Sequence, residues 1–249
     1  MKYIRCLFVW LLLLSLALPA CAETAEPVPA QTLYSFYDGS VFVGDSITRQ
    51  LRTYIQEQKE KDQPVPDITF LTAQSYMLYT ASRKFLLDSK ANIMYKGEKQ
   101  PLCRIIGKIK PEKMFILLGV NDYAGEEIEK HIGYCERILT LMEEFSPDTA
   151  VYFFSLTPLT RSFSSSRRRD LRTCWDEYNA ALEKMCQEKG AFYIDIATPL
   201  KDAEGYLPKE YSNDKQYHLS DKGLQIWLDT LLAYAKGQYD QGLWTPQMP

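Results

Sequence analysis

The sequence predicts an α/β fold in which a parallel β-sheet lies between two layers of helices. Short apolar segments rich in β-branched and aromatic residues alternate with longer amphipathic segments of helical period, from about residue 40 onward. Polar turn residues follow several of the apolar segments, and no internal repeat interrupts the alternation. This order is typical of a parallel sheet, because its crossover helices cover both of its faces.

Five strands and four long helices are expected. The predicted strands are residues 40–44, 67–72, 113–119, 150–155 and 191–195, and the predicted helices are residues 47–59, 126–145, 166–189 and 220–236. Between the second and third strands, residues 88–111 are too many for a plain connection. Within them, residues 93–99 predict a small hairpin and residues 102–109 a short helix. This insertion either walls one side of a crevice at the sheet edge or is a surface excursion.

The N-terminal residues have the order of a secretory signal. Lys2 and Arg5 precede an apolar run that ends in small residues, and the run is shorter than the about 20 residues that span a bilayer. Residues 1–22 are therefore predicted to be a signal peptide, and the protein is expected to be secreted or held in the cell envelope. Cys21 fits either a lipid-modified cysteine or a plain cleavage site, and Pro19 favours plain cleavage. A lipid on Cys21 would be the only membrane attachment expected.

The rest of the chain is expected to form one domain. Residues 23–37 predict an unstructured tether, residues 38–240 one folded domain and residues 241–249 a C-terminal tail, since about 200 residues suit a single core. The net charge is −3, and it becomes −5 without the two basic residues of the predicted signal. Nucleic-acid binding needs a broad basic surface, so no nucleic-acid partner is expected.

The cysteines outside the predicted signal are Cys103, Cys135, Cys174 and Cys186. Cys174 and Cys186 fall in one predicted helix, about 18 Å apart along its axis, so they cannot pair with each other. Two disulfides would then each join one of these two cysteines to Cys103 or Cys135. Four buried free thiols are the alternative.

No metal or cofactor is predicted for this chain. Its histidines are His131 and His218, and the sequence has no Cys-x-x-Cys pair or cluster of histidines and cysteines. A structural zinc site needs four such ligands, commonly at short spacings, so the sequence offers no support for one.

The first predicted strand ends in Gly44, Asp45 and Ser46, where the chain is expected to turn into a helix. At such an elbow the hydroxyl of Ser46 points out of the carboxyl end of the sheet, and its own N–H lies near the helix N-terminus. Ser46 is therefore a candidate nucleophile that also carries an oxyanion donor. The simpler interpretation is that Ser46 caps the helix, since serine is common at that position.

Two further polar segments adjoin predicted elements. Gly119, Asn121 and Asp122 come at the end of the third strand, and Asp214 and His218 lie just before the last helix. Asparagine carries an amide that can donate a hydrogen bond to developing negative charge. A histidine in a loop over the carboxyl edge of the sheet can accept the proton of a serine hydroxyl.

These three segments resemble, in order, the motifs of the SGNH (GDSL-type) hydrolases, over roughly residues 41–235. The motifs that match are the nucleophile block Gly44, Asp45 and Ser46, the block Gly119, Asn121 and Asp122, and the catalytic His218. The resemblance implies an exported bacterial enzyme with a flavodoxin-like three-layer α/β/α fold and a five-stranded parallel sheet of order 2-1-3-4-5. In that order the elbow and the Asn121 turn follow adjacent strands, so both face the crevice where ligands bind.

The chain departs from the family pattern at two positions. The acid usually lies three residues before the histidine, but Lys215 stands there, and the nearest upstream carboxylate is Asp214. Asp214 is therefore the candidate triad acid, and a Ser-His dyad oriented by a backbone carbonyl is the alternative. Ser75 stands where the second block of the family has glycine, and its N–H can serve only if Ser75 adopts the required dihedral angles.

The resemblance implies a serine esterase that needs no cofactor. Ser46 would attack an ester carbonyl while His218 accepts its proton. The oxyanion would be held by the backbone N–H groups of Ser46 and Ser75 and by the amide of Asn121. The residues expected to brace the turns that carry these groups are Gly44, Asp45, Gly119 and Asp122.

The expected substrates are small-molecule or glycan esters with short acyl chains, and O-acetyl groups on glycans are the first choice. Each buried CH₂ contributes about 0.8 kcal/mol, and the sequence shows no long apolar lid or groove that would bury a long chain. Two alternatives stay open. One is a catalytically silent envelope protein that binds glycans in the same crevice, and the other is a lysophospholipase or thioesterase with a different acyl pocket. The sequence does not predict an oligomeric state.

Overall fold

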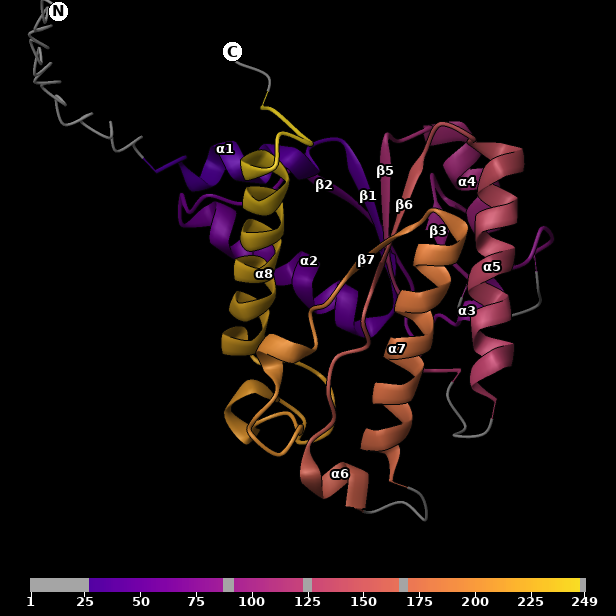
Figure 1. Cartoon of the computed structure of the whole chain (residues 1–249). Coiled ribbons are helices and arrows are strands. Elements are labelled where there is room, and N and C mark those ends of the chain that lie inside the picture. The colour runs from indigo at the N-terminus through magenta and orange to yellow at the C-terminus, as the bar shows by residue number, and fades with distance from the viewer. Residues whose placement is uncertain (1–26, 87–91, 123–126, 166–169, 247–249) are drawn as a thin grey trace, which may run out of the picture.

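The computed structural model describes residues 27–86, 92–122, 127–165 and 170–246, and it shows three layers (Figure 1). The middle layer is a five-stranded parallel sheet of order β2-β1-β5-β6-β7. Its strands are β1 (Ser40–Gly44), β2 (Ile68–Thr72), β5 (Lys113–Leu117), β6 (Ala150–Phe154) and β7 (Phe192–Ile194). Counted along the sheet strands alone, this is the predicted order 2-1-3-4-5, so the flavodoxin-like α/β/α prediction is confirmed.

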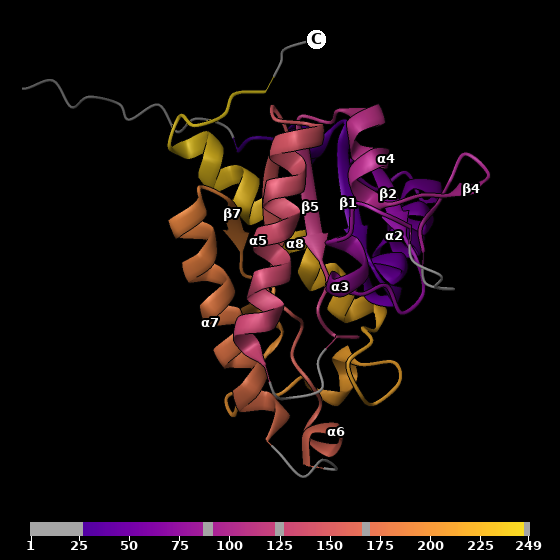
Figure 2. The same ribbon diagram turned by 90° about the vertical axis from the view of Figure 1, so that its right-hand side faces the viewer.

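Helices cover both faces of the sheet. Figure 1 shows α1, α2 and α8 on one side and α3, α4, α5 and α7 on the other, and Figure 2 shows the second group face on. The helices are α1 (Ala30–Tyr34), α2 (Ser46–Glu60), α3 (Leu78–Ala81), α4 (Leu102–Ile109), α5 (Ile128–Phe145), α6 (Arg161–Ser165), α7 (Leu171–Lys189) and α8 (Asp221–Asp240). The predicted helix starts at residues 126 and 166 lie outside the described residues.

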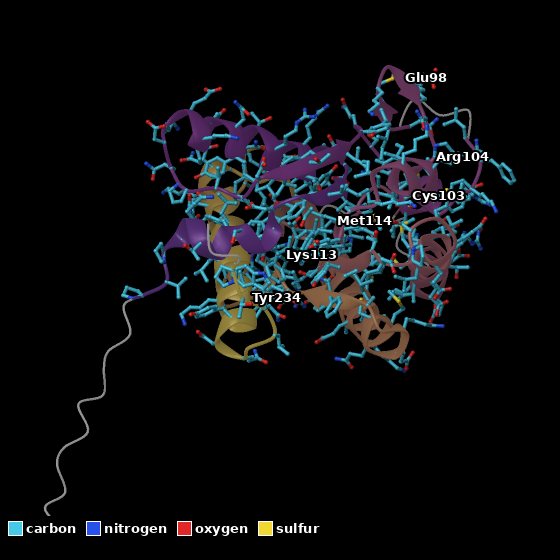
Figure 3. The ribbon with its side chains drawn as sticks, turned by 90° about the horizontal axis from the view of Figure 1, so that it is seen from above. Glu98, Cys103, Arg104, Lys113, Met114 and Tyr234 are labelled. Atoms are coloured by element: carbon cyan, nitrogen blue, oxygen red, sulfur yellow. The ribbon has the colours of Figure 1, made fainter. Side chains whose placement is uncertain are left out.

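The sheet is apolar on both faces because each face packs against helices. In β1, Val41, Phe42 and Val43 are all fully buried, which is the uninterrupted apolar pattern of a central parallel strand. The ring of Phe42 packs 4.7 Å from that of Phe115 on the neighbouring strand, and Trp227 of α8 covers this face. Figure 3 shows side chains filling the space between the sheet and the helices on both faces.

The N-terminal boundary of the domain differs from the prediction. Residues 30–37 were expected to belong to an unstructured tether, but they form α1 and a 3₁₀ turn (Ser35–Tyr37) whose apolar side chains are buried. The hydroxyl of Tyr37 donates to the carbonyl of Leu231 in α8 at 2.8 Å, and the ring of Phe36 packs against Trp244. The tether prediction was wrong here because these side chains are buried by contacts with the other end of the chain. Trp244 likewise packs on the core, although it lies in the predicted tail.

The insertion between the second and third predicted strands is built as expected from its sequence. It contains a hairpin of β3 (Met94–Tyr95) and β4 (Glu98–Lys99), followed by α4. Strand β3 contacts β2, so the hairpin lies at the β2 edge of the sheet. Residues 87–91 lie outside the described residues.

All four described cysteines are buried free thiols. The structure therefore contains the alternative without disulfides. Among the helices that the structure describes, none is long and apolar enough to cross a membrane.

Candidate active site

The turn from β1 into α2 places Ser46 at the carboxyl edge of the sheet. Asp45 is the N-cap of α2, and its Oδ1 accepts a hydrogen bond from the backbone N–H of Ile47 at 2.9 Å. A side chain on Gly44 would overlap Thr48 and come within 2.9 Å of the carbonyl oxygen of Leu117. The elbow therefore requires glycine before the acid. The interpretation of Ser46 as the helix cap does not hold, because Asp45 has that role and Ser46 is the first helical residue.

The structure brings Ser46, His218 and Asp214 together in one hydrogen-bonded chain. The Oγ atom of Ser46 lies 2.8 Å from Nε2 of His218, although the two residues are 172 positions apart. The other ring nitrogen of His218, Nδ1, lies 2.6 Å from Oδ2 of Asp214. The side chains of His218 and Asp214 are 25% and 27% exposed, so solvent and a small ligand can reach the pair. This is the order of contacts that a nucleophile, a base and an orienting acid require.

The carboxyl group of Asp214 is held in its charged form. Partial burial disfavours that charge, but the hydrogen bonds from His218 and from the backbone N–H of Gln216 outweigh it and lower the pKa of Asp214. A carboxylate accepts hydrogen bonds and cannot donate one, so Nδ1 of His218 must carry the proton in this contact. Nε2 is then left free to accept the proton of the Ser46 hydroxyl.

Ser75, the second backbone donor expected for the oxyanion, has a left-handed backbone conformation. Its φ of 54° lies in the left-handed region, which favours glycine. Ser75 is exposed in the turn after β2. Ser75 therefore holds a left-handed φ at this position although it carries a side chain.

Asn121 is at the site, but its amide already has protein acceptors. Its Nδ2 donates to Oδ2 of Asp45 at 2.7 Å and to the carbonyl oxygen of Tyr76 at 3.3 Å. An amide nitrogen has two hydrogens, so both are engaged in this structure. Donation to an oxyanion would share or replace one of these bonds, and the bond to Tyr76 is the longer one.

The residues expected to brace turns do so partly across loops. Gly119 has a φ of 131°, which a side chain would strain, and its carbonyl accepts from the N–H of Asp122 at 3.2 Å. The carboxyl group of Asp122 accepts from the backbone N–H groups of Leu78 and Tyr79 at 2.6 and 2.8 Å. Asp122 therefore fastens the turn that carries Asn121 to the start of α3, just beyond the turn that carries Ser75.

Gln50 is a site residue that sequence reasoning missed. Its side-chain amide accepts from the N–H of Leu219 at 3.2 Å and donates to the carbonyl of the same residue at 3.3 Å. Leu219 follows His218, so Gln50 ties the histidine loop to the helix that begins with Ser46. The available signal was helical spacing, since Gln50 lies four residues after Ser46 and on the same side of α2.

A cavity of about 270 Å³ adjoins this contact, between α2 and the segment that carries His218. Among its lining residues, Arg49, Arg52, Glu57 and Asn213 have exposed polar side chains. Tyr54, Leu219 and Leu224 line it as well, whereas Ser46 and His218 do not, so this cavity lies beside the Ser46–His218 pair and does not contain it. Within the described part of the chain, no group of three or more histidine, cysteine, aspartate or glutamate residues could hold a metal ion.

The arrangement of this site agrees with the result of comparing the sequence with models of known protein families, one of which matches most of the chain. A sequence model described as the GDSL-like lipase/acylhydrolase family matches residues 42–226, from the first sheet strand into α8. The chain belongs to this family. The resemblance inferred from the motifs is thus confirmed, and this GDSL-like acylhydrolase acts on ester bonds.

Solved structures support the fold of this GDSL-like acylhydrolase. A GDSL-like lipase from Bacteroides thetaiotaomicron is 15% identical, with a TM-score of 0.56 over 86% of this chain and 92% of that chain. A carbohydrate esterase of family 3 from Talaromyces cellulolyticus is 16% identical, with a TM-score of 0.53 over 81% and 98%. The acetyl xylan esterase AlAXEase is 14% identical, with a TM-score of 0.53 over 78% and 98%. No curated protein sequence matches the chain.

Proposed function

We propose that this protein is an exported serine esterase that removes short acyl groups, O-acetyl groups on glycans first, through an acyl-enzyme. The observation that carries the proposal is the chain of contacts from Ser46 Oγ to His218 at 2.8 Å and from His218 to Asp214 at 2.6 Å. A serine hydroxyl is a weak nucleophile until a base accepts its proton, and this geometry supplies the base and its orienting acid.

In the proposed reaction, Nε2 of His218 accepts the hydroxyl proton while Ser46 Oγ attacks the ester carbonyl. Collapse of the tetrahedral intermediate breaks the bond to the alcohol, which leaves with the proton from His218. Water then gives its proton to His218 and attacks the acyl-enzyme, and the carboxylic acid leaves as Ser46 recovers its proton. Asp214 stabilises the imidazolium formed in each half of the cycle without being protonated itself.

The oxyanion of both intermediates would receive hydrogen bonds from the backbone N–H groups of Ser46 and Ser75. The N–H of Ser46 belongs to the first turn of α2, where the helix leaves donors unpaired and favours negative charge. The amide of Asn121 would add a third donor by shifting one of its bonds from the carbonyl of Tyr76 to the oxyanion. Preorganised donors of this kind commonly supply roughly 10²- to 10³-fold in rate each.

A small acyl group on a hydrophilic substrate is favoured by the sequence, which shows no long apolar lid or groove, and by two of the fold neighbours. Selectivity for long acyl chains would need an apolar groove, because each buried CH₂ contributes about 0.8 kcal/mol. The names of two fold neighbours, an acetyl xylan esterase and a carbohydrate esterase, support the same class of substrate.

Export is proposed from the N-terminal sequence. Residues 1–22 have the basic, apolar and small-residue order of a signal peptide, and cleavage without a lipid is preferred at Cys21. Mass spectrometry of the mature N-terminus separates the two forms, since a lipidated protein would begin at a modified Cys21.

The nucleophile is tested with a fluorophosphonate probe on purified wild-type protein, Ser46→Ala and His218→Ala. Only a serine activated by a base should be labelled, so the wild type should react and both variants should not. Both variants should also lose nearly all ester hydrolysis, because removing either member of a catalytic unit removes most of the rate. Their circular dichroism spectra should match that of the wild type. An unlabelled, inactive wild type would favour a silent glycan-binding protein.

Substrate class is tested by kcat/KM over p-nitrophenyl esters from acetate to palmitate. The maximum should lie at acetate or propionate, and acetate should then be released from O-acetylated peptidoglycan or xylan. A maximum at octanoate or longer would overturn the glycan proposal in favour of a lipase or lysophospholipase.

A further inference from the structure

The turn between the acid and the histidine has an unusual backbone. Four positions separate Asp214 from His218, one more than the three that the family pattern led us to expect. The extra length is taken up at Lys215, whose φ of 62° lies in the left-handed region, while its side chain is exposed. This conformation is unfavourable for any residue with a Cβ, so something in the surrounding structure must hold it.

The carboxyl group of Asp214 closes the turn from inside. Its Oδ1 accepts from the backbone N–H of Gln216 at 2.7 Å, and from those of Tyr217 and His218 at 3.2 and 3.3 Å. Its Oδ2 remains for the imidazole of His218. The direction of that second oxygen therefore depends on the backbone of residues 215–218.

Thr160 holds the same turn from outside. It lies in the loop between β6 and α6 and is only 1% exposed. Its hydroxyl donates to the carbonyl of Lys215 at 2.6 Å, and its backbone N–H donates to the carbonyl of Gln216 at 2.8 Å. Two consecutive carbonyls of the expanded turn are thus fixed by one buried residue from a different part of the chain.

The far side of the histidine is fixed separately. Gln50 of α2 binds both backbone polar groups of Leu219, and the N–H of Asn213 donates to the carbonyl of His218 at 3.1 Å. Gln50 therefore sets the position of the segment relative to Ser46, while Thr160 supports the part that contains Lys215. Without the Thr160 hydroxyl, the carbonyl of Lys215 would keep, among the described residues, the longer contact from the hydroxyl of Ser162 at 3.4 Å.

We propose that Thr160 is a positioning residue for the His218–Asp214 pair, and that its hydroxyl holds the left-handed turn at Lys215 so that an acid four residues upstream reaches the histidine. This inference rests on the proposed function of that pair. Thr160 touches neither member directly and acts through the carbonyls of residues 215 and 216. The bond from its hydroxyl to Lys215 is the shortest that this hydroxyl makes, and the same oxygen also accepts from the N–H of Phe163 at 3.4 Å and lies 3.3 Å from the hydroxyl of Ser162.

The direct test compares Thr160→Val with Thr160→Ser in the full protein, with short-chain ester hydrolysis as the assay. Valine keeps the shape but removes the hydroxyl, and serine keeps the hydroxyl. We expect kcat to fall about 10- to 100-fold in Thr160→Val with KM nearly unchanged, since small displacements of reacting groups have effects of this order. Thr160→Ser should recover most of the loss. Equal kcat in wild type and Thr160→Val would overturn the proposal.

Thr157 offers a matched control in the same loop. It is fully buried, and its hydroxyl has no hydrogen-bond partner among the described residues. Thr157→Val should leave kcat unchanged. A loss in Thr157→Val as large as that in Thr160→Val would show that any change in this loop impairs the enzyme, and would contradict a specific role of Thr160.

A double-mutant cycle with Asp214→Asn separates positioning from general packing. If Thr160 acts by directing Asp214 toward His218, Thr160→Val should cost much less in the Asp214→Asn background than in the wild type. Independent, multiplying effects of the two substitutions would contradict the proposal.

Lys215 gives a second test that leaves Thr160 intact and decides the matter if Thr160→Val does not fold. Glycine accepts the left-handed conformation and a β-branched residue strains it. Lys215→Gly should therefore keep wild-type kcat, while Lys215→Val should lose kcat as Thr160→Val does. Equal activity of these two variants would show that the conformation at 215 does not matter to the reaction.

If instead Ser46→Ala still hydrolyses esters, the proposed function itself fails, whatever the Thr160 and Lys215 variants do.

Discussion

The carboxyl group of Asp45 joins the β1–α2 elbow, which carries Ser46, to Asn121. One oxygen caps α2 through the N–H of Ile47, and the other accepts from the amide of Asn121 at 2.7 Å. Burial raises the pKa of this carboxyl from 3.8 to about 6, although the hydrogen bond from Ile47 acts in the opposite direction. Asp45 thus releases its proton at about pH 6 in the folded protein.

This raised pKa has a consequence for stability. Between about pH 4 and about pH 6 the folded protein keeps a proton on Asp45 that the unfolded chain has already released. The contribution of this group is therefore fully present below about pH 4 and is lost as the pH rises through about 6. Asp45→Asn removes this titration and keeps an acceptor for the cap. Its free energy of unfolding, minus that of the wild type, should rise over this interval.

The measurement is urea unfolding of wild type and Asp45→Asn at several pH values from about 4 to about 7. Taking the difference between the two proteins cancels the other titrating groups. A difference that stays constant or falls with pH would show that the carboxyl of Asp45 does not titrate with a raised pKa.

Asn121→Ala tests the amide as an oxyanion donor. We expect kcat to fall by roughly 10²- to 10³-fold with little change in KM, as for a contact made mainly in the transition state. Steady-state kinetics on p-nitrophenyl acetate measures both constants. An effect on KM alone would make Asn121 a substrate-binding residue. Its amide would then keep its bonds to Asp45 and Tyr76 throughout the reaction.

At the scale of elements, the β1–α2 elbow leaves no space for a side chain at Gly44. In Gly44→Ala the new methyl group would overlap Thr48 and press on the carbonyl of Leu117 in β5. We expect a loss of about 1–3 kcal/mol of stability, which thermal unfolding would show as a lower Tm, together with lower activity. Gly133→Ala in α5 is the control, since nothing lies within 4 Å of the place its methyl group would take and alanine favours helix. A Tm of Gly44→Ala equal to that of the wild type would contradict the packing described here.

The elements that the sequence predicted well are those with local patterns. The strands end within two residues of their predicted limits, and α4 has the predicted bounds, because alternation and amphipathic period are read from neighbouring residues. Residues 30–37 were missed because Phe36 and Tyr37 gain their burial from α8 and Trp244, about 190 positions or more away. No local pattern carries that information.

The residues of the candidate site also fall into those that local motifs predict and those that depend on distant contacts. Ser46, Asn121 and His218 could be named from short motifs at the ends of elements. The role of Asp214 could not be decided from spacing, because it depends on a left-handed residue at 215 and on Thr160, which is 55 positions from Lys215. The engagement of Asn121 by Asp45 was equally hidden, since it follows from the packing of two strand ends side by side.

At the scale of the whole molecule, the four described cysteines are buried free thiols, although an exported protein could form disulfides. Burial raises the pKa of Cys135 and of Cys186 to about 12, so almost no reactive thiolate is present at neutral pH. The core therefore holds without cross-links. We expect Cys103, Cys135, Cys174 and Cys186 not to react with Ellman's reagent in the native protein and to react after unfolding in guanidinium chloride.

Thermal unfolding with and without a reducing agent completes this test. The Tm should be the same in both, because the four cysteines that the structure describes form no disulfide. A fall in Tm on reduction, or fewer than four reactive thiols in the unfolded mature chain, would show that bridges form after all.

The packing of Phe36 against Trp244 brings the two ends of the folded chain together at one pole of the molecule. Figure 1 shows α1 and the segment after α8 at the end opposite α6, which follows the carboxyl edge of the sheet. A surface, an affinity tag or a domain fused ahead of α1 is therefore attached at the end of the domain opposite the carboxyl edge of the sheet. An immobilised form of this esterase would present the carboxyl edge of the sheet, with Ser46, outward to the solution.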